Sequence, residues 1–220
     1  MKPPDGKRPS EEVGFAELAR SQGATFDRLL LALAAEFRPV AWTEERDRLD
    51  ALARPLFGIA RMSAEAAAKR IAASLWHEAG LRPSSIGTDV LFLDRTLRCR
   101  RGHPALLAAI YVEVARRAGL ALSLLSSPDA WFAGVTDREG LVLVELAASP
   151  TPASCQGRLR VRRQCPHELA YAVLSSLAGH LSARGRAGEA RRARQLALLL
   201  PLHRDTQEGL RRVRGGLVED

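Results

Sequence analysis

Apolar residues recur every three or four positions over the first third of the chain, which is the spacing of one face of an α-helix. Phe15, Leu18 and Phe26 belong to the first such stripe, which predicts one or two amphipathic helices within residues 11–37. A second stripe follows Thr43, whose hydroxyl side chain suits the start of a helix. The pattern therefore predicts a helical N-terminal region behind a disordered, proline- and charge-rich tail at residues 1–10.

Two further helices are predicted by residues that favour the start or the end of a helix. Ser63 precedes an alanine-rich run that reaches His77, and Gly80 follows as a typical C-terminal glycine. Pro104 suits the first turn of the next helix, which Gly119 stops. In this central helix Glu113 and Arg117 are spaced as an i,i+4 ion pair, and we expect that pair on the outer face.

The period changes from helical to alternating after residue 119. Short strands are expected at residues 120–125, 130–135 and 141–146, with a hairpin turn at 136–140. A basic fourth strand at 158–163 would alternate arginines with Leu159 and Val161. Residues 166–214 return to helical spacing, with breaks at 185–188 and 201. Helices, a central helix, an antiparallel meander and a helical hairpin make an α+β fold.

The segments around the central helix carry a family resemblance. LFLDRTLRCRRGHPALLAAIYVEVARRAGLAL, from residue 91 to 122, resembles the "rrGiP" turn, helix and "arrlGl" end of the SirB1-like, transglutaminase-like family. DAWFAGV and LVLVELA resemble that family's strand pair, and the last segment resembles its tetratricopeptide-like tail. The resemblance covers about residues 11–215. It implies a transglutaminase-like domain at 11–165 and a tetratricopeptide-like helical segment at 166–220.

The resemblance also implies a papain-type layout of three catalytic groups. A cysteine or serine would begin the central helix, a histidine on a strand would take its proton, and an acid on the next strand would orient the ring. The positions that should hold the nucleophile carry His103, Pro104, Ala105 and Leu106. The histidine positions carry Asp129 and Ala130, and the acid position carries Glu145. Since two of the three groups are missing, we predict a pseudoenzyme that acts by binding.

Several residues leave alternatives open. Cys99 lies among arginines with His103 nearby, so it is either a displaced nucleophile of a cysteine-dependent hydrolase or transferase, or a partly buried thiol. His103 is either a base or a solvent-exposed residue at the start of its helix. Asp129 and Glu145 either bind a cation or basic partner or pair with nearby arginines, and Trp131 is expected to pack in the core. The remaining histidines are scattered, so neither a metal site nor a cofactor is predicted.

The net positive charge is concentrated in the last third of the chain. The chain has a net charge of +8, and residues 151–220 hold 13 arginines and 6 acidic residues, which leaves the first 150 residues at +1. The candidate binding residues in this tail are Arg184, Arg186, Arg191, Arg192, Arg194, Arg211, Arg212 and Arg214. We expect an acidic or peptide-like protein partner. Nucleic acid is the alternative, disfavoured because the tail offers only Tyr171 for base stacking.

The N-terminus, the longest apolar run and the cysteines indicate the cellular compartment. The N-terminus lacks the apolar core of a secretory signal, and the longest apolar run, residues 29–35, is far shorter than the roughly 20 residues that span a bilayer. The cysteines, Cys99, Cys155 and Cys165, show neither disulfide nor zinc spacing. These features predict a cytoplasmic protein of bacterial type that does not contact membranes.

Overall fold

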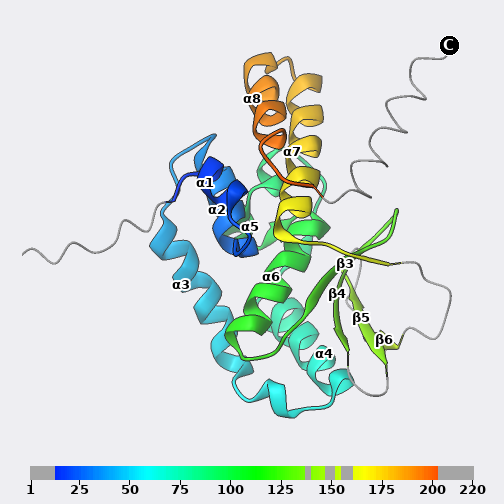
Figure 1. The fold of residues 1–220 in the computed structure, drawn as a ribbon. Coiled ribbons are helices and arrows are strands. Elements are labelled where there is room, and N and C mark those ends of the chain that lie inside the picture. Colours follow the sequence, from blue (N-terminus) through cyan, green and yellow to red (C-terminus); the bar gives the residue numbers. More distant parts are fainter. Residues whose placement is uncertain (1–12, 137–139, 147–151, 155–160, 203–220) are drawn as a thin grey trace, which may run out of the picture.

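A computed structural model describes residues 13–136, 140–146, 152–154 and 161–202 (Figure 1). The helices are α1 (Phe15–Arg20), α2 (Phe26–Ala35), α3 (Trp42–Ala53), α4 (Ala64–Ala72), α5 (Leu93–Cys99), α6 (Pro104–Arg117), α7 (Pro166–Ala183) and α8 (Ala187–Ala197). Short helical turns are η1 (Arg54–Leu56), η2 (Ile59–Arg61), the π-helical η3 (Ala73–Glu78) and η4 (Asp89–Leu91). The strands are β1 (Arg82–Pro83), β2 (Arg101–Gly102), β3 (Ser123–Ser126), β4 (Trp131–Thr136), β5 (Leu141–Glu145), β6 (Pro152–Ser154) and β7 (Arg162–Arg163). The mixed α+β architecture expected from the sequence is confirmed.

The predicted helix boundaries agree with the structure where capping chemistry is local. The Ser63 hydroxyl accepts a hydrogen bond from the Ala66 amide, and Pro104 is the first residue of α6. Gly119 adopts φ +85°, a conformation that disfavours side chains with a Cβ and therefore ends α6 cleanly. The start expected at Thr43 is one residue late, because α3 begins at Trp42.

A five-stranded antiparallel sheet follows α6, in the order β6-β5-β4-β3-β7. The three meander strands lie within three residues of their predicted starts. The basic strand expected at 158–163 is described only at its end, where β7 pairs with β3, and residues 158–160 lie outside the described residues. Arg162 and Arg163 are both exposed, so the predicted alternation of a polar and a buried face does not hold within β7.

Two helices cover one face of this sheet (Figure 1). α6 packs against β3 and β4, while α4 packs against β4, β5 and β6. The inward residues of the strands, including Leu124, Ala133 and Val144, join a core that runs from α1 to α8. Leu125, Phe132 and Leu143 form a separate cluster on the other face, as strand alternation requires. The central positions of the sheet are thus buried on both faces.

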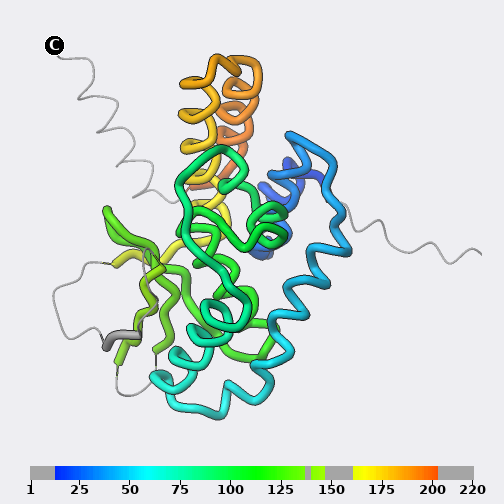
Figure 2. The backbone as a smooth tube through the Cα atoms, turned by 180° about the vertical axis from the view of Figure 1, so that it is seen from behind, coloured from blue at the N-terminus to red at the C-terminus, as the bar shows by residue number. Residues whose placement is uncertain are grey.

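The helical hairpin of α7 and α8 stands above this body (Figures 1 and 2). α7 packs against α2 and η4 through its buried apolar residues, among them Leu174 and Leu177. Arg192 of α8 also forms an ion pair with Glu36 at the end of α2. The hairpin is therefore held on the body mainly by apolar packing and partly by one of its own arginines.

The expectation that Glu113 and Arg117 lie on the outer face is wrong. The pair forms, with Nη1 of Arg117 2.8 Å from Oε2 of Glu113, but the Glu113 side chain is only 3% exposed. Arg117 also contacts Asp27 of α2 and Asp50 of α3. The packing of α2 and α3 against α6 encloses the pair, and the i,i+4 spacing contains no information about those neighbours.

Candidate functional site

The resemblance places the nucleophile at the N-terminus of α6. The polar groups of His103 at this helix end already form hydrogen bonds within the chain. His103 is the N-cap residue, and its Nδ1 accepts a hydrogen bond from the Ala105 amide at 3.2 Å. The His103 amide donates to the Val90 carbonyl at 2.9 Å. Ala105 and Leu106 are buried in the core. This helix end offers neither a thiol nor a hydroxyl to a substrate.

His103 is half-buried, not fully solvent-exposed as one of the two alternatives assumed. Burial, and secondarily the charge of His180, lowers the pKa of His103 below its ordinary value. Because Nδ1 accepts a hydrogen bond, the neutral ring carries its proton on Nε2. The imidazole therefore acts as a helix cap, and its acceptor nitrogen is already used.

Asp129 lies in the turn before β4 and Glu145 at the end of β5, and the two carboxylates are not part of a charged cluster among the described residues. Glu145 is opposite Phe132 in the β4–β5 ladder, and the Leu146 amide donates to the Trp131 carbonyl at 3.2 Å. Asp129 and Glu145 are exposed, and neither forms an ion pair with a residue in the described ranges, against the expectation of nearby arginine partners. Trp131 packs against the core as expected.

Cys99 is exposed, which contradicts the alternative of a partly buried thiol. It is the last residue of α5, at the carbonyl end of the helix, which favours cations rather than anions. Arg100 follows with φ 58°, the one positive value at a non-glycine residue in the described part of the chain. The structure therefore brings no hydrogen-bonded base to Cys99 among the described residues.

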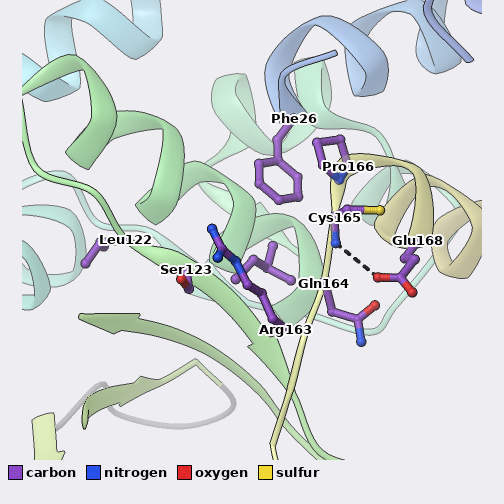
Figure 3. Close-up of a pocket in the computed structure, with 9 residues that line it drawn as sticks. Phe26, Leu122, Ser123, Arg163, Gln164, Cys165, Pro166 and Glu168 are labelled. Carbon is purple, nitrogen blue, oxygen red and sulfur yellow. Dashed lines mark hydrogen bonds between the residues drawn. The ribbon is translucent and has the colours of Figure 1, made fainter. Parts of the chain in front are cut away.

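A pocket that sequence reasoning missed lies where the sheet meets the hairpin (Figure 3). Its volume is about 400 Å³, within the range of small-ligand sites. The walls come from the start of α2 (Phe26), the start of β3 (Leu122–Leu124), and the connection from β7 into α7 (Arg163–Pro166, with Glu168). Phe26 and the start of β3 lie about 140 and 40 residues before the first residue of α7, so only tertiary folding joins these segments. No local motif could have revealed the pocket.

Cys165 lies at the N-cap of α7 beside this pocket, a position that resembles the one the family gives its nucleophile. Its thiol is engaged in a capping box with Glu168, whose Oε2 accepts a hydrogen bond from the Cys165 amide at 3.1 Å. Burial raises the pKa of the Cys165 thiol, so the reactive thiolate is disfavoured. The neighbouring His167 directs its Nε2 to within 3.4 Å of the Leu18 carbonyl.

The acidic residue in the pocket lining has a cationic partner, whereas the basic residue has no acidic partner among the described residues. Glu168 is buried, and its Oε1 lies 3.4 Å from Nη2 of Arg162. Arg163 is exposed and forms no ion pair with any residue in the described ranges. Figure 3 shows the Arg163 side chain directed toward Ser123 on the same side as the Phe26 ring, while the Cys165 sulfur and Glu168 carboxylate lie on the other side. The open part of the pocket therefore has an excess positive charge.

The candidate arginines of the hairpin are exposed, but they do not form one free basic surface. Arg186 pairs with Glu189 at 2.5 Å, Arg192 pairs with Glu36, and Arg194 donates to the Ser182 hydroxyl at 2.8 Å. Arg184 and Arg191 have no ion-pair partner among the described residues. Arg211, Arg212 and Arg214 lie outside the described residues, as does Cys155.

Within the described ranges, no three histidine, cysteine or acidic side chains gather where they could hold a metal ion. None of the helices in those ranges has the length and apolar character needed to cross a membrane.

Comparison with known proteins places the fold. A search of curated proteins gives no match. The solved structure of menin, titled "Crystal structure of menin reveals the binding site for Mixed Lineage Leukemia (MLL) protein", is similar with a TM-score of 0.53 and 14% identity. The similarity covers 74% of this chain but only 45% of the menin chain, so it supports the fold alone. A family model for the transglutaminase-like superfamily matches residues 26–153, from α2 through β6. With more than half of its length matched, the chain belongs to the transglutaminase-like superfamily.

Proposed function

We propose that this chain is a non-catalytic, SirB1-like member of the superfamily that works by binding an acidic or peptide-like segment of a protein partner. The observation that carries the proposal is the start of α6. The residues from His103 to Leu106 supply no nucleophile there, and the His103 ring is used as a helix cap. The position that the resemblance gives to the histidine holds Asp129 and Ala130, which lie just before β4.

The expected effect of these replacements on catalysis is large. Removing the nucleophile or base of a catalytic triad typically lowers turnover by about 10⁶-fold. The described cysteines offer no substitute, because Cys99 lies at the carbonyl end of α5 and burial raises the pKa of Cys165. A hydrolase or transferase of the triad type is therefore not expected.

Binding has independent support from the shape of the molecule. The pocket beside α7 lies where the transglutaminase-like domain meets the helical hairpin. Helices α7 and α8 pack closely, and small residues such as Ala178, Ala190 and Ala193 are buried there. That pattern supports a tetratricopeptide-like unit docked on the body as a cap. Menin, which shares the fold, is reported by its title to have a binding site for a protein.

The test is labelling of the full chain with a broad thiol-directed activity probe, together with generic amide and ester substrates. The expected result is no turnover above the buffer rate and no stoichiometric labelling of a single cysteine at neutral pH. Cys99→Ser and Cys165→Ser serve as matched variants. Turnover that either substitution abolishes would show an active enzyme and overturn the proposal.

A further inference from the structure

The pocket between β3 and the start of α7 has features that select one class of ligand. Its open part is bounded by the Arg163 guanidinium, the Ser123 hydroxyl and the Phe26 ring (Figure 3). We infer that this pocket binds an extended peptide segment of a partner protein through an acidic side chain flanked by apolar residues. The inference deepens the proposed function and depends on it.

The charge of the site argues for an anionic ligand. Glu168 is the one acidic residue of the lining, and its carboxylate is already shared between the Cys165 amide and Arg162. The capping box also occupies the amides at the start of α7, so the helix end is not the anchor. Arg163 is left as a cation with no acidic partner among the described residues. A guanidinium fork matches a carboxylate in a bidentate geometry.

The sheet edge argues for a peptide rather than a free small anion. The Gln164 amide donates to the Leu124 carbonyl at 2.8 Å, which extends the β3–β7 pairing one residue beyond Leu125–Arg163. Proline has no N–H, so the first residue of α7 cannot continue the ladder. The β7 side of the ladder therefore ends beside the start of β3, and none of the described backbone hydrogen bonds from the β7–α7 connection reaches Leu122. An added chain can pair with the backbone there, as in strand addition at sheet edges.

The apolar walls define what should flank the acidic side chain. Phe26, Leu122 and Pro166 line the pocket around the guanidinium, and the cavity of about 400 Å³ has room for only a few residues. The polar groups fix orientation while these apolar surfaces are removed from water, which is the usual division of roles in such sites.

The test uses defined peptides and amide chemical shifts of the full chain. The probes are acetyl-Ala-Leu-Glu-Leu-Ala-amide, its aspartate version, and the matched glutamine peptide, each titrated to low millimolar concentration. We expect saturable shifts centred on residues 122–124 and 163–168. Arg163→Gln should weaken binding of the acidic peptides by about ten- to a hundredfold, because it removes a charge-assisted hydrogen bond. The glutamine peptide should bind both proteins equally weakly.

Arg61→Gln is the matched control, since it removes the same charge from an exposed arginine of η2 that lines no part of the pocket and has no ion-pair partner among the described residues. It should leave peptide affinity unchanged. The inference is overturned if none of the peptides shifts the pocket residues, or if Arg163→Gln and Arg61→Gln affect binding equally. Such a result leaves the proposed lack of catalysis standing, because only the activity-probe experiment addresses that.

Discussion

Arg117→Met is expected to destabilise the fold strongly, because one guanidinium bonds carboxylates from three helices. Nη2 lies 2.5 Å from Asp27 Oδ2, Nε lies 2.7 Å from Asp50 Oδ1, and Nη1 lies 2.8 Å from Glu113 Oε2. The side chains of Asp27 and Glu113 are each 3% exposed. Methionine preserves much of the apolar stem but provides no donor.

The loss of stability depends on which carboxylate is left without a cationic partner. Glu113 keeps Arg116 at 2.8 Å and the Phe26 amide at 3.0 Å. Asp27 keeps the hydrogen bond from Thr25 but no cation among the described residues. Removing one partner of a buried ion pair costs about 3–5 kcal/mol. Since only one carboxylate is left uncompensated, we expect about 3 kcal/mol, a large share of the roughly 5–15 kcal/mol that stabilises a domain.

The pH dependence makes this expectation sharper. Burial by itself would raise the pKa of Asp27, but the Thr25 hydrogen bond and the Arg117 charge outweigh it and lower the pKa. In the native protein, the stability from Asp27 is thus present above the ordinary pKa of about 3.9 and is lost as pH falls through the lowered value. Without Arg117 the pKa of Asp27 should be higher than in the native protein, so the variant's deficit should shrink as pH falls and Asp27 takes up a proton.

Urea denaturation followed by circular dichroism at pH 7 and pH 5 measures both effects. Asp50→Asn is the control, because the Asp50 side chain is 56% exposed and its loss should cost less than about 1 kcal/mol. A loss for Arg117→Met no larger than that of the control, or a deficit that is constant with pH, would refute the reasoning.

Three further predictions concern stability measured by urea denaturation. Gly102→Ala should cost about 1–3 kcal/mol, because its Cβ would lie 2.3 Å from Cγ2 of buried Thr96. Adding Thr96→Ala should recover part of that loss, and no recovery would contradict the clash. Burial lowers the pKa of His103, so the unfolded chain takes up this proton first and the native protein should lose stability relative to His103→Asn as pH falls from 7 to 5. Parallel pH curves would exclude this. Leu174→Ala should cost about 2–5 kcal/mol and Arg192→Gln less than about 1 kcal/mol, whereas equal losses would show that the ion pair, not the apolar packing, holds the hairpin.

The fold class could be predicted because its signals are local. Caps such as Ser63 and Pro104, the stop at Gly119, and the change of period after it depend on residues a few positions apart. Helix α5 escaped prediction because its seven residues are too short to show a convincing helical period. The resemblance places the expected nucleophile positions at the start of α6, and the residues that occupy them could be read directly from the sequence.

By itself, then, the sequence determined the order of the longer helices and of the meander strands, and the absence of a thiol or hydroxyl at residues 103–106. Only the tertiary structure decided which charges are compensated. Arg117 is buried and bonds three carboxylates because α2 and α3 pack over it, and Arg192 of the tail is paired because Glu36, distant in sequence, lies beside it. The pocket likewise depends on Phe26, Ser123 and Arg163 meeting in space. Periodicity reports which face of an element is apolar, whereas burial of a charge and the shape of a cavity depend on what other elements bring against that face.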